Sequence, residues 1–162
     1  MGKRVIFLDV DGVLNTIKST SRIHGIIGID DDKVKKLSMI RDKTDSIVVL
    51  TSSWKIDWEK TVYTEDLNSF GRYLVDKLKK YNIYIFDKTD EESSSKRGSG
   101  IREWIKSCDF EIDSFVILDD ELFDYDECGL MPHVVKTSFY DDNGGLQEEH
   151  INRSIAILLN NY

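Results

Sequence analysis

Short apolar runs recur along the chain and alternate with longer amphipathic stretches. The runs 5–8, 46–50, 83–86 and 115–118 contain almost no polar position. Runs of this kind are typical of strands that are buried on both faces of a parallel sheet. Residues 134–135 form a shorter apolar pair after Pro132, which predicts a fifth strand at a sheet edge.

The stretches between these runs carry apolar residues at helical spacing. Residues 65–81 place Leu67, Phe70, Leu74, Leu78 and Tyr81 on one helix face. Helices are also expected from residue 30, over 101–108 and in the region after Gly145. The glycine-containing segment 16–29 predicts a loop or a short hairpin, and the polar segment 87–100 predicts a loop. This alternation predicts a doubly wound α/β fold with a mostly parallel, five-stranded sheet, formed by one domain over residues 1–162.

Composition narrows the class of protein. Of the 162 residues, 40% are hydrophobic and 32% are charged, as in ordinary soluble globular proteins. The net charge of −8 argues against broad, non-specific nucleic-acid binding. This charge is still compatible with a local basic rim near an active site. Cys108 and Cys128 have no zinc or redox spacing. No apolar stretch has the length of a signal peptide or a membrane span, so we expect a cytoplasmic protein without membrane contact.

Carboxylates follow two of the predicted strands directly. Asp9 and Asp11 come after the run 5–8, and Asp119 and Asp120 come after the run 115–118. Open α/β sheets form their sites at the carboxyl ends of strands. Carboxylates this close repel one another unless a cation lies between them, and Mg²⁺ prefers oxygen ligands. The alternative interpretation is an acidic surface turn, which the apolar run before each pair disfavours.

Two further segments carry candidate chemistry. Thr51 and Ser52 end the strand 46–50, where a hydroxyl and a neighbouring N–H can hold a phosphate oxygen. Ser and Thr also cap helices everywhere, so a structural N-cap is the alternative. Lys96 and Arg97 precede the helix 101–108 and, taken alone, are an exposed basic pair in a loop.

The segments F-L-D-V-D-G-V-L-N and T-S-S-W resemble motifs I and II of the haloacid dehalogenase (HAD) superfamily of phosphohydrolases. The resemblance implies that Asp9 is the nucleophile and that Asp11 is the general acid and base. It places Thr51, with Ser52 beside it, in the phosphate-binding position. It also implies a sheet order of 5-4-1-2-3.

The later segments complete the resemblance. I-L-D-D-E is similar to motif IV, in which Asp120 would ligate Mg²⁺ and Asp119 would support it, together with the two motif I aspartates. The basic pair is similar to motif III, whose cation stabilises the carboxylates and the phosphoryl oxygens. Lys96 matches the commoner residue of the superfamily, whereas the run R-G-x-x-I-x-x-W favours Arg97, so both stay candidates.

Together, these segments resemble the small HAD domains of Swiss army knife RNA-repair proteins. The intervals between motifs hold no room for a cap domain, so the fold is expected to be capless. The resemblance implies an Mg²⁺-dependent phosphatase that forms an aspartyl-phosphate, with a phosphorylated RNA or DNA end as the expected substrate. Lys18, Arg22, His24 and Lys55 are candidates for holding that substrate. A small-molecule phosphatase and a catalytically idle HAD-fold binding module are the alternatives, and the oligomeric state stays open.

Overall fold

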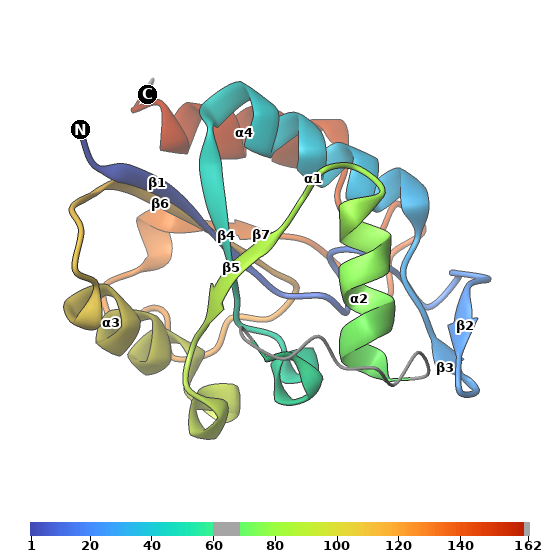
Figure 1. The fold of residues 1–162 in the computed structure, drawn as a ribbon. Helices are drawn as coiled ribbons and strands as arrows, with labels where there is room; N and C mark the ends of the chain where they lie inside the picture. Colours follow the sequence, from blue (N-terminus) through green and yellow to red (C-terminus); the bar gives the residue numbers. More distant parts are fainter. Residues whose placement is uncertain (60–68, 161–162) are drawn as a thin grey trace.

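The computed structural model describes residues 1–59 and 69–160, without the side chains of residues 91 and 94. Its centre is a parallel sheet of β1 (Lys3–Leu8), β4 (Ser46–Leu50), β5 (Ile85–Lys88), β6 (Ile112–Asp119) and β7 (Val134–Lys136). The strand order is β5-β4-β1-β6-β7. Counting only these strands, this order is 5-4-1-2-3 read from the β7 edge, which confirms the expected topology (Figure 1).

Helices cover both faces of the sheet. Helices α1 (Asp31–Thr44), α2 (Phe70–Lys79) and α4 (Glu148–Leu158) lie on one face, and α3 (Arg97–Ser107) lies on the other (Figure 1). Short 3₁₀ helices occur at Ser53–Asp57 (η1), Glu91–Ser95 (η2) and Met131–His133 (η3). A small hairpin of β2 (Arg22–Ile23) and β3 (Ile26–Ile27) occupies the expected loop 16–29. Among the described residues, no separate cap accompanies this α/β layer structure.

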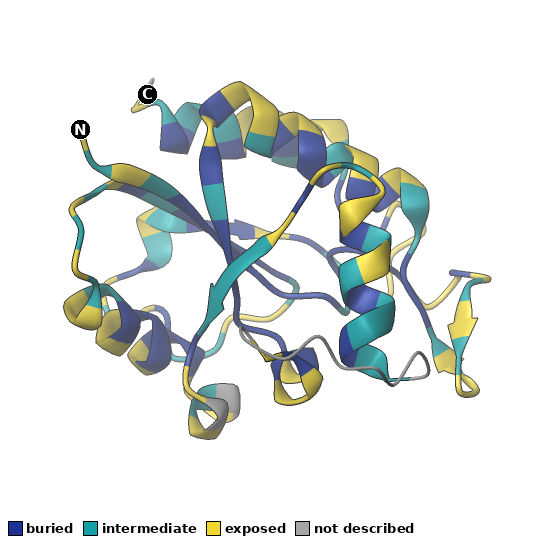
Figure 2. Ribbon diagram, in the orientation of Figure 1, coloured by how far each residue is buried: buried dark blue, intermediate teal, exposed yellow. Residues whose placement is uncertain are grey.

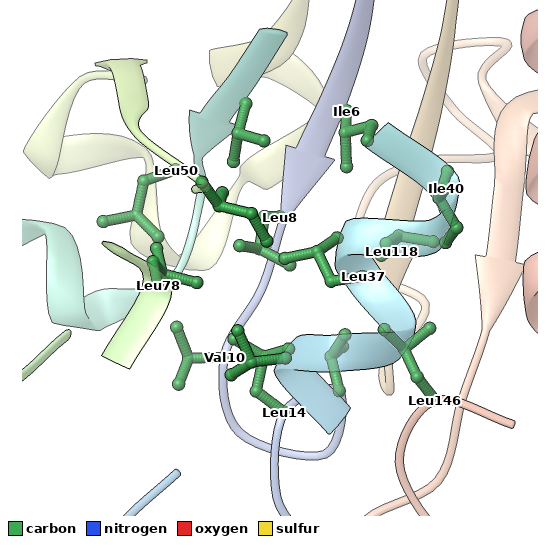
Figure 3. Packing of buried hydrophobic residues seen from close by; sticks show 14 of the residues in the cluster. Ile6, Leu8, Val10, Leu14, Leu37, Ile40, Leu50, Leu78, Leu118 and Leu146 are labelled. Carbon is green, nitrogen blue, oxygen red and sulfur yellow. The ribbon is translucent and has the colours of Figure 1, made fainter. Parts of the chain in front are cut away.

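The central position of β1 in the sheet explains why its sequence is continuously apolar. Successive side chains of a strand point to opposite faces of the sheet. Ile6 and Leu8 belong to the core under α1, α2 and α4, whereas Val5 and Phe7 belong to the core under α3. All four side chains are fully buried, and the ribbon of β1 is coloured as buried over most of its length (Figure 2). Figure 3 shows Ile6 and Leu8 in the core on the α1 face. A polar residue at any of these positions would therefore be buried in one core or the other.

Several predicted boundaries differ from the structure: β6 begins at Ile112 rather than at residue 115, and α2 ends at Lys79 rather than at residue 81. The strand expected at 83–86 begins at Ile85, because Asn82 adopts a left-handed conformation and Ile83 N–H closes the end of α2 on the Leu78 carbonyl. Helix α3 begins at Arg97, four residues before the expected start. Helix α2 begins at Phe70, and the start expected at residue 65 lies outside the described residues.

Candidate active site

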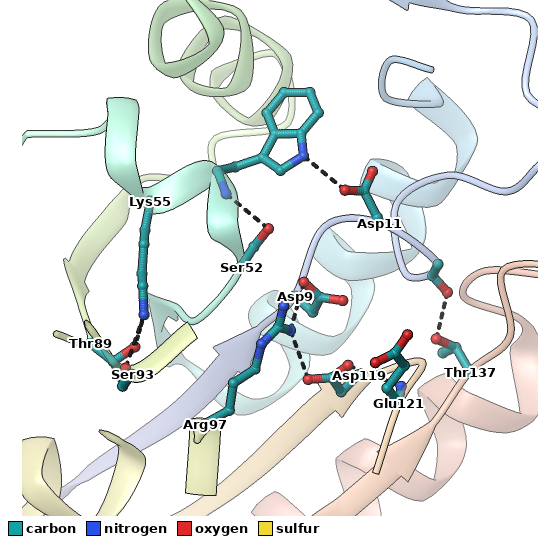
Figure 4. A network of polar contacts seen from close by, with 12 residues as sticks. Asp9, Asp11, Ser52, Lys55, Thr89, Ser93, Arg97, Asp119, Glu121 and Thr137 are labelled. Atoms are coloured by element: carbon teal, nitrogen blue, oxygen red, sulfur yellow. Dashed lines mark hydrogen bonds and ion pairs between the residues drawn. The ribbon is translucent and has the colours of Figure 1, made fainter. Parts of the chain in front are cut away.

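The carboxyl ends of β1 and β6 bring three carboxylates together. The two strands are parallel neighbours in which Leu8 pairs with Leu118, so that Asp9 and Asp119 follow side by side. One carboxylate oxygen from each of Asp9, Asp119 and Asp120 lies within 4.8 Å of the others. This group is the acidic centre of the site, of which Figure 4 shows Asp9 and Asp119.

Gly12 makes the approach of Asp120 to the motif I loop possible. Its φ of +80° lies in the left-handed region that favours glycine. A Cβ atom at this position would lie 2.4 Å from the Asp120 carboxyl carbon. The Gly12 carbonyl also accepts a 2.5 Å hydrogen bond from the Thr137 hydroxyl, which ties the loop to the end of β7. A larger residue at position 12 would displace the Asp120 carboxylate.

Arg97, and not Lys96, enters the acidic centre. Arg97 Nη1 lies 2.8 Å from Asp9 Oδ1 and 2.9 Å from Asp119 Oδ2, and the Arg97 side chain is only 9% exposed (Figure 4). The Phe123 ring lies 4.3 Å from the Arg97 guanidinium carbon. Lys96 is exposed. The two neighbours diverge because successive side chains at the start of a helix point in different directions around its axis.

Burial and mutual repulsion raise the pKa values of two carboxyl groups in the acidic centre. Burial, and next the Asp119 carboxylate, raise the pKa of Asp9 well above its usual range, although Arg97 opposes the shift. Burial and the nearby Asp119 raise the pKa of Asp120 to about 6. Desolvation and like charge disfavour the ionised forms of both groups. The oxygen-only donor set therefore fits a hard divalent cation, which would relieve this repulsion.

Asp11 lies apart from the acidic centre. Its carboxylate accepts a hydrogen bond from the Asn15 side-chain amide at 2.9 Å. It accepts a second from the Trp54 indole N–H at 3.1 Å (Figure 4). Asn15 is itself fixed, because it also donates to the Gly28 carbonyl and accepts from the Gly12 N–H. The sequence analysis placed the Asp11 carboxylate around the metal together with Asp9, Asp119 and Asp120. The acidic group found among the described residues contains the other three carboxylates and not that of Asp11. The geometry suits an oriented proton donor or acceptor more than a side-chain metal ligand.

The two hydroxyls after β4 have different surroundings. Thr51 is fully buried, and its Oγ1 has no hydrogen-bond partner in the part of the chain that the structure describes. Ser52 accepts a 3.2 Å hydrogen bond from the Trp54 N–H and thereby caps η1 (Figure 4). The structural N-cap considered from the sequence is thus formed by the Ser52 hydroxyl. The Thr51 hydroxyl remains available to bind a ligand.

Several residues of the site gave little sequence signal. The Tyr125 hydroxyl donates a 2.6 Å hydrogen bond to Asp119, and nothing in its loop sequence indicates this contact. The hydrogen bond from the Trp54 indole to Asp11 depends on the approach of η1 to the motif I loop, which the local sequence does not indicate. Asp124, in the loop after β6, accepts hydrogen bonds from the N-terminus of α3.

Lys55 does not lie at the rim of the site, where the sequence suggested a role in holding substrate. It is fully buried, and its Nζ donates to the Thr89 hydroxyl, the Asp90 carbonyl and the Ser93 hydroxyl (Figure 4). These bonds join η1 to the turn before α3. Lys55 therefore ties together the segments that carry Thr51 and Arg97.

The fold and the acidic centre together define a HAD-like α/β protein, and the comparisons with known proteins agree. A family model described as the HAD domain in Swiss Army Knife RNA repair proteins matches residues 5–151. The chain belongs to this family. A solved structure described as a HAD superfamily (subfamily III A) hydrolase from Legionella pneumophila superposes with a TM-score of 0.52. It shares 17% identity over 98% of this chain and 82% of that chain, and the likeness concerns the fold. Among curated proteins, none matches the chain.

None of the described helices is both long enough and apolar enough to cross a bilayer.

Proposed function

We propose that this protein is an Mg²⁺-dependent phosphohydrolase that works through an aspartyl-phosphate on Asp9. One observation carries the proposal. Three buried side-chain polar atoms lack a hydrogen-bond partner among the described residues, and two of them, Thr51 Oγ1 and Arg97 Nε, belong to the residues around Asp9. Buried donors are rarely left unpaired unless an unseen group satisfies them. A phosphate group offers oxygen acceptors for both.

The proposed metal has a plausible set of ligands. Asp9, Asp119 and Asp120 supply carboxylate oxygens from two adjacent strand ends. A bound Mg²⁺ would act as a Lewis acid that polarises the phosphoryl oxygens. Asp119 also binds Arg97 and Tyr125, so we propose that it mainly holds the site together and that Asp9 and Asp120 would ligate the cation.

The chain's own residues then divide the reaction into two steps. An Asp9 carboxylate oxygen forms a bond to phosphorus as the bond from phosphorus to the leaving oxygen breaks, and Asp11 gives that oxygen a proton. Asp11 next takes a proton from a water molecule, whose oxygen attacks phosphorus and releases Asp9 and inorganic phosphate. Asn15 and Trp54 orient Asp11 for both transfers. Arg97 offsets the negative charge that develops on the phosphoryl group.

The surroundings of Asp9 and Asp11 favour a substrate that carries its phosphate at the end of a large molecule. Asp9 is only 3% exposed, so the phosphoryl group must enter the buried site to reach its carboxylate. The leaving group would stay outside, near the half-buried Asp11. No cap encloses the leaving group among the described residues, so a long substrate can be accommodated. We propose a phosphorylated RNA or DNA end as this substrate, in line with the RNA-repair proteins for which the family is described.

A cavity beside the β2–β3 hairpin supports this choice. Its volume is about 400 Å³, and Arg22, His24, Lys77 and Lys80 line it together with Tyr73, two aspartates and Ile23. Lys77 and Lys80 both bind one of these aspartates, Asp31. Tyr73 also lies against Trp54, with 6.1 Å between ring centroids, and Trp54 contacts Asp11. Cations near aromatic rings are the features with which proteins hold single-stranded nucleic acid. Lys18 is paired with Asp142 and does not line this cavity.

A substrate panel with matched variants tests the proposal. We expect kcat/KM to be higher for 3′- or 5′-phosphorylated oligonucleotides than for nucleoside monophosphates or sugar phosphates, and activity to vanish after chelation and return with Mg²⁺. Asp9→Asn should abolish turnover and the acid-stable phosphoryl label on the protein.

Three outcomes would contradict parts of the proposal. Equal or better hydrolysis of a mononucleotide or sugar phosphate would indicate a small-molecule phosphatase. No hydrolysis of any phosphate ester would favour an idle binding module. Normal turnover by Asp9→Asn would exclude the covalent mechanism.

A further inference from the structure

We propose that Asp124 is a positioning residue that holds the start of α3 so that the Arg97 guanidinium stays between Asp9 and Asp119. The kinetic part of this inference rests on the proposed phosphatase function. The structural part does not, because it concerns the placement of Arg97 in the resting protein.

Asp124 binds the first turn of α3 through three hydrogen bonds. Its Oδ1 accepts from the Gly98 N–H at 2.6 Å, and its Oδ2 accepts from the Ser99 N–H at 3.0 Å and from the Ser99 hydroxyl at 2.7 Å. Lys96, the residue at the N-cap position of α3, makes no side-chain cap hydrogen bond. The first N–H groups of a helix need acceptors from outside the helix. Asp124 therefore caps α3 from a segment more than twenty residues away in the sequence.

The sequence at the start of α3 is adapted to this close approach. A Cβ atom on Gly98 would lie 2.9 Å from both the Asp124 carbonyl oxygen and Asp124 Oδ1. Although burial acts to raise it, hydrogen bonds from the Ser99 hydroxyl and from the Gly98 and Ser99 N–H groups hold the pKa of Asp124 below its usual value. A carboxylate near a helix N-terminus also interacts favourably with the helix dipole.

The neighbours of Asp124 contact the same site from other sides. The Phe123 ring lies beside the Arg97 guanidinium, and the Tyr125 hydroxyl donates to Asp119. Three consecutive residues thus contact Arg97, the helix that carries Arg97, and the carboxylate that Arg97 binds. Because Arg97 is the first residue of α3, any shift of the first helical turn moves its guanidinium relative to Asp9.

Asp124→Ala tests the proposal, with Asp126→Ala as its matched control. Asp126 is an exposed aspartate in the same segment. With p-nitrophenyl phosphate as the probe, Asp124→Ala should lower kcat about tenfold to a hundredfold, because misplacing a catalytic group by about 1 Å can cost this much. KM should change little, since Thr51 stays in place, and Asp126→Ala should match the wild type. Fluorescence or circular dichroism would show that each variant is folded.

A double-mutant cycle distinguishes positioning from general stabilisation. In the Arg97→Ala background, Asp124→Ala should cause no further loss of kcat, because no guanidinium remains to be positioned. A merely structural role would lower kcat by the same factor in both backgrounds. Equal losses in the two backgrounds would therefore overturn the proposal, as would an unchanged kcat in the folded Asp124→Ala protein.

Nitrogen-15 spectra of the Arg97 side chain provide a readout without activity. The signals would be identified by their absence in Arg97→Lys, and they should shift or broaden in Asp124→Ala but not in Asp126→Ala. If the wild type hydrolyses no phosphate ester, the proposed function fails while these spectra still decide the positioning role. If Asp124→Ala does not fold, Asp124→Asn and Ser99→Ala remove fewer of the three bonds and should produce smaller shifts of the same kind. Unchanged Arg97 signals in both would contradict the inference.

Discussion

Replacing Arg97 with alanine should damage both the activity and the stability of this protein, whereas replacing Lys96 should affect neither. Arg97 bridges Asp9 and Asp119 at 2.8 and 2.9 Å and is almost fully buried. Removing one partner of a buried ion pair costs about 3–5 kcal/mol, because the remaining charge stays buried without its counter-charge. Asp119 retains hydrogen bonds from Tyr125 and from the Glu121 N–H, so we expect a loss near the lower end, about 3 kcal/mol.

The kinetic effect should be of comparable size. Removing one preorganised group that stabilises charge in the transition state typically lowers kcat by about 10²–10³-fold. Alanine favours helices at least as well as arginine, so the substitution itself should not weaken α3. Any loss in activity can therefore be assigned to the missing guanidinium rather than to the helix.

Urea unfolding in the presence of a chelator and steady-state hydrolysis of a phosphate ester measure the two effects. Added Mg²⁺ should restore part of the lost stability of Arg97→Ala, since a cation would again lie among the carboxylates. Lys96→Ala is the control, and it should change the free energy of unfolding by less than about 0.5 kcal/mol, as exposed substitutions usually do. An effect of Lys96→Ala on kcat as large as that of Arg97→Ala would refute the reasoning.

The remaining predictions concern Thr51 and Asp120. Thr51→Val should leave the free energy of unfolding unchanged or slightly higher in urea titrations, because it removes a buried hydroxyl that has no hydrogen-bond partner in the described part of the chain. It should nevertheless lower kcat/KM through loss of a phosphate contact, and a large loss of stability would show that the hydroxyl is already satisfied. In metal-free protein, Asp120 has a pKa of about 6 when folded and an ordinary value of 3.8 when unfolded. The unfolded carboxyl loses its proton first as pH rises, so wild-type stability relative to Asp120→Asn should fall between pH 4 and pH 6, and a pH-independent difference in urea midpoints would contradict the shift.

The sequence by itself determined the layers of the fold and the edge of the sheet that carries the site. Continuous apolar runs must be buried on both faces, so they become central parallel strands. Acids placed directly after two such runs must then emerge at the same edge of the sheet. For this reason Asp9, Asp119 and Asp120 could be placed together without coordinates, and the structure brings their carboxylates within 4.8 Å.

Only the tertiary structure decided between neighbours in the chain. Lys96 and Arg97 carry the same charge and differ by one position, and the direction in which α3 begins determines which of them reaches Asp9. That start depends on Asp124, whose hydrogen bonds to Gly98 and Ser99 come from a distant loop. Sequence periodicity describes contacts within an element, whereas a cap supplied by another segment leaves no local pattern.

The same distinction explains the other differences. Ser52 and Thr51 carry adjacent hydroxyls, but only the fold shows that Ser52 caps η1 and that the Thr51 hydroxyl has no hydrogen-bond partner among the described residues. Lys55 looks like a rim cation in the sequence, and it is buried because the turn before α3 folds over it. Trp54 reaches Asp11 for a similar reason. Side-chain roles at such junctions depend on how loops from different strands meet, which short-range sequence patterns do not encode.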